Sequence, residues 1–231
     1  SEEMKNKTLL SFELFPPKTE KGLQNLPGTI DHLMKYNPSY ISCTYGAGGG
    51  NVGANREVCQ MIKNAGTTPV THFTVIKNTK EGIKEQLDQY LADGVDHMLA
   101  LRGDIPLGET TTCGDFDYAT DLVKFVRDTY GDKFEIAVAG SPEGHISCRS
   151  LESDIAVLKQ KQDNGADYIM TQLCWDMEQF KYWLDAIRKA GITMPVDVGV
   201  MPILDQAATL FASAFALDDR KLAEQFASIF M

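Results

Sequence analysis

Long apolar runs are missing from this chain of 231 residues, and none approaches the length that a membrane-spanning helix needs. Residues 1–5 are polar and lack the apolar core of a signal peptide. Basic residues are in deficit, because 22 lysines and arginines face 32 aspartates and glutamates, for a formal net charge of −10. This charge argues against nucleic acid and anionic membranes as partners, although it leaves room for a local basic pocket for a phosphate.

Disulfide and metal-binding patterns are also lacking. The five cysteines are an odd, scattered set, with no C-x-x-C pair and no Cys/His cluster at zinc-site spacing. Free thiols indicate a reducing compartment, so we expect a cytoplasmic protein without a metal centre. A hydrophobic content of 43% supports a packed core, and we expect a single domain over residues 1–231.

Short apolar runs alternate with segments of helical spacing, such as Ile83, Leu87 and Tyr90. We predict seven strands, at Leu9–Phe15, Tyr40–Thr44, Pro69–Val75, His97–Leu101, Phe134–Ala139, Tyr168–Leu173 and Val196–Ile203. This alternation favours an α/β fold, specifically a (β/α)8 TIM barrel, over a doubly wound sheet. No eighth strand is identifiable in 204–231, which suggests missing residues or a partner that covers the open edge.

Polar and glycine-rich residues gather directly after the predicted strands. They include Pro16-Pro17, the glycines of 46–50, Arg102-Gly103-Asp104 and Ser141-Pro142-Glu143. In barrels of this class the active site lies at the C-terminal ends of the strands. We therefore expect a functional site at this end of the strands.

Glu13 stands out because it interrupts the first apolar strand, among Phe12, Leu14 and Phe15. Desolvation in such a setting favours the neutral carboxyl and raises its pKa. An acid tuned in this way is a candidate general acid at neutral pH. The alternative is that Glu13 faces the barrel interior and pairs with a base such as Arg102.

Residues Gly48 to Gly53 satisfy G-x-G-x-x-G, after a strand and before a helical stretch. A dinucleotide-binding fold would also place an acidic residue at the end of the next strand, and that strand holds Thr71, His72 and Thr74 instead. The glycine loop also follows the second strand and not the first. We therefore interpret it as a flexible loop that borders a ligand.

Read together, the strand ends carry short motifs in a specific order. They are Ser11-Phe12-Glu13-Leu14-Phe15-Pro16-Pro17, Thr44-Tyr45-Gly46-Ala47, His72-Phe73-Thr74, Ala100-Leu101-Arg102-Gly103-Asp104, Pro142-Glu143-Gly144-His145, Thr171-Gln172 and Gly199-Val200-Met201-Pro202-Ile203. In this order they resemble the bacterial-type, FAD-dependent methylenetetrahydrofolate reductase family. The resemblance runs from Leu9 to Ile203 and ends before Leu204.

The resemblance implies a barrel enzyme of one-carbon metabolism that holds FAD without a Rossmann fold. In the family, NADH or NADPH reduces the flavin and leaves, and methylenetetrahydrofolate then stacks on the same flavin face. Glu13 matches the family's general acid, which protonates the folate so that its five-membered ring opens to an iminium. The flavin then delivers hydride to the methylene carbon.

The resemblance also implies the positions of the binding residues. Those that line the flavin are Thr44, His72, Arg102, Gly103, Asp104, Tyr118, Ala119, His145, Asp154 and Lys161. Asp104 and Gln172 resemble positions that meet the folate pterin, and Asp104 is also expected to act in catalysis by biasing the flavin's charge.

Ordinary structural roles account for several of the same residue types. They are a hydrogen-bonded core histidine at His72, a partner of Glu13 or Asp104 at Arg102, a solvated charge at Lys161, a helix-dipole contact at Asp154 and helix packing at Tyr118.

Two other functions stay open. Ser141, Val157 and Gln160 depart from common flavin contacts of the family, which is compatible with folate chemistry that depends on a partner redox protein. A non-catalytic barrel subunit is the other alternative. We further expect a homo-oligomer, and a mobile loop at Ile105–Asp117 that closes over the ligand, although a simple surface loop fits the sequence equally well.

Overall fold

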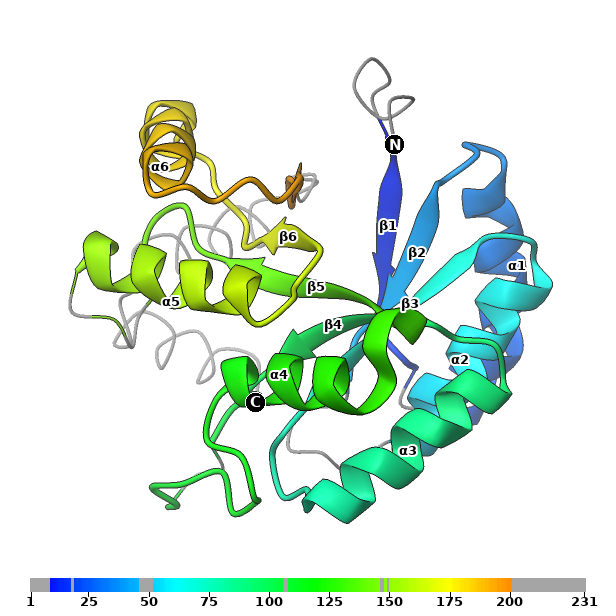
Figure 1. Cartoon of the computed structure of the whole chain (residues 1–231). Coiled ribbons are helices and arrows are strands. Elements are labelled where there is room, and N and C mark those ends of the chain that lie inside the picture. Colours follow the sequence, from blue (N-terminus) through cyan, green and yellow to red (C-terminus); the bar gives the residue numbers. More distant parts are fainter. Residues whose placement is uncertain are drawn as a thin grey trace. The chain divides into compact units, whose positions relative to one another are not determined.

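The computed structural model of the chain describes residues 9–17, 19–45, 52–105, 108–145, 148 and 150–200. Strands and helices alternate along the chain (Figure 1). The elements are β1 (Ser11–Leu14), α1 (Glu20–Met34), β2 (Tyr40–Cys43), α2 (Val52–Asn64), β3 (Thr68–Thr74), α3 (Lys80–Ala92), β4 (His97–Leu101), α4 (Ala119–Tyr130), the 3-10 turn η3 (Gly131–Lys133), β5 (Glu135–Gly140), α5 (Leu151–Asp163), β6 (Tyr168–Thr171), α6 (Met177–Lys189) and β7 (Val196–Asp197). The strands are neighbours in chain order, from β1 to β7, and the pairings β1–β2, β2–β3, β3–β4, β4–β5 and β6–β7 are parallel.

The chain divides into two compact units. Unit 1 contains Ser1–Val138 with Asn164–Ala166, and unit 2 contains Ala139–Asp163 with Asp167–Met231. In each unit, strands and helices alternate along the chain. Together with the parallel strand pairs, this alternation confirms the predicted parallel α/β class.

The core of unit 1 lies between its strands and its helices. In β3 every residue after Thr68 is buried, as expected for a parallel strand that is covered on both faces. Helix α2 packs on β2 and β3, and the apolar face of α3 is fully buried at Ile83, Leu87 and Tyr90, as its spacing predicts. This packing fixes the strands whose ends carry the candidate site residues.

In unit 2, helix α6 is fixed at its start by Asp176, whose carboxylate accepts hydrogen bonds from the backbone N–H groups of Glu178 and Gln179. Its side chain Trp183 is fully buried. A Cβ at Gly140, at the end of β5, would lie 2.6 Å from Ile169 and 3.1 Å from Trp183. Glycine at this position therefore lets the indole pack closely on the strand.

The predicted strands agree with the observed ones in number and order. The prediction His97–Leu101 is exact, whereas β7 ends at Asp197 and residues 198–200 continue without strand pairing. Helix α1 escaped the sequence patterns because Pro27 and Gly28 lie inside it, and both residues usually interrupt helices.

Several predictions fall on residues outside the described ranges. These are the glycine loop at 46–51, the motif residues 201–203 and the segment 204–231, in which no eighth strand was found. Across the ranges that the structure describes, no helix combines the length and apolar character that crossing a membrane requires. All five cysteines are free thiols.

Candidate functional site

Glu13 lies on β1 and reaches a residue two strands away. Its Oε2 is 3.5 Å from Nε2 of His72, on β3, and the strand between them contributes Ser42 at the level of Glu13. The His72 side chain is 8% exposed, and that of Glu13 is 46% exposed. The contact therefore joins a buried imidazole to a carboxyl group that still reaches solvent.

Burial shifts the pKa of both groups toward their neutral forms. It lowers the pKa of His72 to about 4, so the imidazole is neutral at pH 7. It also raises the pKa of Glu13, although the exposed part of the carboxyl group limits the rise. The contact at 3.5 Å is therefore not an ion pair at pH 7, because the imidazole carries no charge there.

The end of β4 provides Arg102, Gly103 and Asp104. Arg102 donates a hydrogen bond from Nε to the carbonyl oxygen of Gly103, at 3.2 Å, and among the described residues it forms no ion pair with Glu13 or Asp104. The interpretation of Arg102 as a partner of these acids therefore has no support in the geometry. Asp104 is exposed, directly after the glycine.

Gly103 has a backbone conformation that favours glycine, with φ of +84°. A Cβ at this position would lie 2.6 Å from Cγ1 of Ile76 and 3.1 Å from Cβ of Thr74. Residue 103 therefore has no room for a side chain larger than the hydrogen of glycine. The backbone after β4 lies directly against the end of β3.

The end of β2, including the half-buried Thr44, is fixed by a buried side chain of α2. Asn55 donates from Nδ2 to the carbonyl oxygens of Cys43 and Thr44, at 2.9 and 3.1 Å. Its Oδ1 accepts from the hydroxyls of Thr71 and Tyr90, at 2.8 and 2.7 Å. Asn55 therefore connects α2 to the ends of two strands and to α3.

Sequence reasoning did not identify Asn55. One signal was available, because this amide lies four residues before Cys59 and seven before Ile62, on the face of α2 that is fully buried. A polar residue on such a face needs hydrogen-bond partners, which points to a network.

The second half of the segment between β4 and α4 is held in place by hydrogen bonds and burial. The backbone N–H of Lys77 donates to the carbonyl oxygen of Thr112 at 2.8 Å, and the Thr112 hydroxyl donates to that of Phe116 at 2.6 Å. Both Thr112 and Phe116 are buried. Their burial and hydrogen bonds hold the second half of the predicted loop, Ile105–Asp117, against the rest of unit 1. The closure of this loop over a ligand stays a prediction.

Tyr118 and Ala119 begin helix α4. The Tyr118 side chain is exposed, so the interpretation of this residue as ordinary helix packing does not hold. Its backbone N–H donates to the carboxylate of Asp121, at 3.0 Å, and Ala119 is buried. An exposed aromatic ring at a helix start is available to a ligand.

Unit 2 brings together Asp154 and Lys161, both on α5. Lys161 donates from Nζ to the carbonyl oxygen of Ala139, at 3.1 Å, and burial lowers its pKa while Asp154 and Cys148 partly oppose the shift. Asp154 accepts a hydrogen bond from the Cys148 thiol at 3.6 Å. Lys161 is therefore no solvated surface charge.

His145 and Gln172 are exposed, near the ends of β5 and β6. The backbone N–H of Gln172 donates to the carbonyl oxygen of Gly140, at 2.8 Å, which places its side chain just after β6. Within the described ranges, no group of three His, Cys, Asp or Glu side chains could hold a metal ion.

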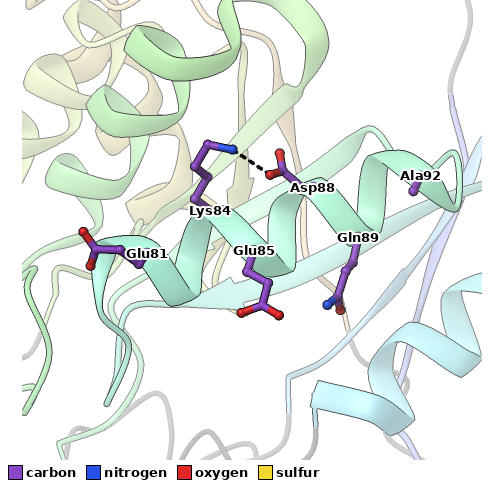
Figure 2. A pocket seen from close by; sticks show the side chains of 6 residues that line it. All are labelled: Glu81, Lys84, Glu85, Asp88, Gln89 and Ala92. Atoms are coloured by element: carbon purple, nitrogen blue, oxygen red, sulfur yellow. Dashed lines mark hydrogen bonds and ion pairs between the residues drawn. The ribbon is translucent and has the colours of Figure 1, made fainter.

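A shallow hollow on α3 is separate from these residues (Figure 2). All of its lining comes from one helix, with Lys84 and Asp88 paired at 2.7 Å on one side and Glu85 and Gln89 pointing to the other. The hollow is lined by Glu81, Lys84, Glu85, Asp88, Gln89 and Ala92. It contains none of the candidate site residues.

Comparison with known sequences gives a consistent result. The family model described as methylenetetrahydrofolate reductase matches residues 1–217. The chain is 38% identical over 221 residues to methylenetetrahydrofolate reductase (NADH) 1 of Arabidopsis thaliana, covering 90% of this chain and 37% of the relative. It is 34% identical over 202 residues to 5,10-methylenetetrahydrofolate reductase of Escherichia coli, covering 87% of this chain and 67% of the relative. The chain thus spans little more than a third of its plant relatives.

Solved structures show the same fold at low sequence identity. An uncharacterized protein from Clostridium thermocellum, described as binding two copies of 5-methyl-5,6,7,8-tetrahydrofolic acid, matches with a TM-score of 0.66 and 15% identity, over 95% of this chain and 76% of that chain. Phosphoenolpyruvate phosphomutase from Streptomyces platensis subsp. rosaceus matches with a TM-score of 0.61 and 10% identity, over 97% of this chain and 84% of that chain.

Proposed function

Because this chain belongs to the methylenetetrahydrofolate reductase family, we propose that it reduces 5,10-methylenetetrahydrofolate to 5-methyltetrahydrofolate, with Glu13 as the general acid. The observation that carries the proposal is the pairing of Glu13 with the neutral imidazole of His72. The structural relative that is described as binding 5-methyltetrahydrofolate agrees with a folate substrate.

The acid role follows from the state of the carboxyl group. A general acid needs a proton at the working pH, and burial raises the pKa of Glu13 toward that range. The exposed portion of the side chain allows a substrate nitrogen to reach the proton. After transfer, the carboxylate lies beside His72, which in the tautomer that carries hydrogen on Nε2 donates to the new charge.

The residues present fit the flavin that the family uses. His72 Nε2 is buried and forms no hydrogen bond among the described residues. Gly103, with its positive φ, has no side chain to cover the backbone after β4. The residues of unit 1 that match the family's FAD positions are Thr44, His72, Arg102, Gly103, Asp104, Tyr118 and Ala119, and those of unit 2 are His145, Asp154 and Lys161. When bound, FAD supplies hydride, which it receives from NADH or NADPH.

The remaining side chains have roles suited to their chemistry. Arg102 and Lys161 carry donors for phosphate or ribose oxygens. Asp104 accepts hydrogen bonds from flavin and pterin, and Gln172 offers both a donor and an acceptor to the amide-like edge of the pterin. Both Asp104 and Gln172 are exposed, so their polar atoms are accessible to a ligand.

We propose the finer features of the protein on the same basis. The order of β1 to β7 supports a single (β/α)8 barrel domain that an eighth strand completes. Five free thiols support a cytoplasmic location. A homo-oligomer is also proposed, with NADH or NADPH as the electron source and a protein donor as the alternative.

The test is Glu13→Gln, which keeps the shape of the side chain and removes its acidic proton. We expect folate reduction to fall by at least about a hundredfold, the usual minimum for loss of a general acid. Bleaching of the flavin absorbance by NADH or NADPH should be unchanged, because that half-reaction needs no acid from Glu13.

The matched control is Glu85→Gln, on the exposed face of α3, which should leave both half-reactions intact (Figure 2). Normal folate turnover by Glu13→Gln would remove Glu13 from the mechanism. Absence of flavin from the purified protein, with none taken up on addition of FAD, would contradict the proposed function as a whole. Activity only with an added redox protein would replace the nicotinamide donor.

A further inference from the structure

Three polar side-chain atoms on β2 and β3 are buried and form no hydrogen bond among the described residues, although one of them, Nε2 of His72, lies 3.5 Å from Oε2 of Glu13. Within the described ranges, Oγ of Ser42, Nε2 of His72 and Oγ1 of Thr74 form no hydrogen bond, and each of these residues is more than nine-tenths buried. Buried polar groups in native proteins are nearly always hydrogen-bonded, so these unpartnered atoms need an explanation.

The three residues share one face of the sheet. Thr71 and Phe73 alternate with them on β3, and these two face the helices, since Thr71 donates to Asn55 of α2 and Phe73 packs edge-on against Tyr90 of α3. Because side chains on a strand alternate between faces, His72 and Thr74 point the opposite way. On β2, Cys43 interacts with Cys59 of α2, which places Ser42 on that same opposite face.

Both hydroxyls adjoin residues already assigned to the site. Ser42 pairs in register with Glu13, on the neighbouring strand. Thr74 is in register with Leu101, and its Cβ is 3.1 Å from the position that a Cβ of Gly103 would take. The unpartnered hydroxyls thus lie beside the proposed acid and beside the bare backbone after β4.

We propose that Ser42 and Thr74 are ligand-contacting residues of this site, whose hydroxyls receive their hydrogen-bond partners from a bound planar heteroaromatic ring with polar edges. This inference rests on the proposed function and adds two residues to it. A hydroxyl donates and accepts, so it suits the mixed edge of either a flavin or a pterin. Separate measurements with FAD and with 5-methyltetrahydrofolate distinguish the two.

The experiment compares substitutions on opposite faces of the same strand in the full chain. Thr74→Val and Ser42→Ala remove hydroxyls that have no partner, and Thr71→Val removes one that donates to Asn55 at 2.8 Å. Stability is measured without ligand by urea unfolding, and affinity is measured by titration with each probe. Thr74→Ser serves as the variant that keeps the hydroxyl.

Substitutions on the two faces of the sheet should have opposite effects on the urea midpoint and on ligand affinity. Thr74→Val and Ser42→Ala should keep or raise the urea midpoint of the free protein and weaken binding of FAD or 5-methyltetrahydrofolate by about tenfold, the effect of one lost hydrogen bond. Thr71→Val should lower the midpoint and leave both affinities unchanged. Thr74→Ser should bind like the parent.

Unchanged affinity for both probes in Thr74→Val and Ser42→Ala would overturn the inference while the proposed function stands. A urea midpoint lowered as far as in Thr71→Val would also overturn it, because the hydroxyls would then have partners inside the protein. A parent chain that binds neither probe would refute the proposed function, and the inference would fall with it.

Discussion

Glu13 and His72 show how burial, more than charge, controls a contact between an acid and a base. The two side chains lie 3.5 Å apart, a distance that would count as an ion pair if both were charged. Burial lowers the pKa of His72 and raises that of Glu13, so both shifts favour the neutral forms. Both shifts therefore oppose an ion pair at this contact.

The depressed pKa of His72 predicts a pH dependence of stability. Below pH 6.5 the unfolded chain protonates this histidine, whereas the folded chain does so only near pH 4, so the unfolded state binds more protons between these values. The contribution of His72 is thus complete above pH 6.5 and is lost as the pH falls. Relative to His72→Gln, the parent should lose about 2–3 kcal/mol of unfolding free energy from about pH 7 to pH 4.5.

Urea unfolding of the two proteins at a series of pH values measures this difference. Glu13 is present in both proteins, so only the part of its titration that depends on the contact with His72 enters the difference. Parallel stability curves for the parent and His72→Gln would show that His72 is not held neutral by burial.

Gly103 gives a second prediction at the level of a single residue. Gly103→Ala adds a methyl group that would lie 2.6 Å from Ile76, at a φ of +84°, whereas Gly108→Ala meets nothing within 4 Å at a φ of +88°. We expect Gly108→Ala to cost about 1 kcal/mol from backbone strain alone. Gly103→Ala should cost about 1–3 kcal/mol more, from overpacking. Equal urea midpoints for the two variants would contradict the close approach at Gly103.

At the scale of elements, helix α2 does more than cover the sheet. Asn55 joins the carbonyl oxygens at the end of β2 to hydroxyls on β3 and α3, and each of its four hydrogen bonds to these elements measures 3.1 Å or less. One buried amide thus holds the strand end that carries Thr44. The same helix contributes Arg56, which pairs with Asp93 after α3, so α2 is also joined to α3 at its surface.

The network predicts a large effect of Asn55→Ala. The substitution removes the amide and leaves the hydroxyls of Thr71 and Tyr90 and two carbonyl oxygens without their partner. We expect a loss of about 2–4 kcal/mol in unfolding free energy. Gln60→Ala, on the same helix, removes one hydrogen bond to the Asp93 carbonyl and should cost less than about 1 kcal/mol. Similar losses of unfolding free energy for Asn55→Ala and Gln60→Ala, measured by urea unfolding, would show that the Asn55 network does not stabilise the fold more than a single surface hydrogen bond does.

At the scale of the whole molecule, the family model matches residues 1–217, whereas the chain covers only 37% of the length of its relative from Arabidopsis thaliana. The acid and its imidazole lie in unit 1, with most of the residues proposed for FAD, whereas His145, Asp154, Lys161 and Gln172 lie in unit 2. Arg102 and Lys161 are half-buried cations in a chain whose formal net charge is −10.

Much of the fold could be predicted because periodicity is a local property. The spacing of apolar residues along a strand or helix, such as Ile83, Leu87 and Tyr90, indicates which side faces the core. Gly66 and Gly165 follow helices and take the positive φ that is typical of that position. Helix α1 was missed because Pro27 contradicts the local rule and tertiary packing overrides it.

The sequence by itself determined the order of strands and helices, the acid within the first strand and the family motifs at the strand ends, since each can be read from residues close together in the chain. Only the tertiary structure decided that Glu13 meets His72 instead of Arg102, that Asn55 holds the end of β2 and that Lys161 donates to the carbonyl oxygen of Ala139. These outcomes depend on burial and on contacts between residues distant in sequence, and no local pattern encodes which buried polar group finds a partner.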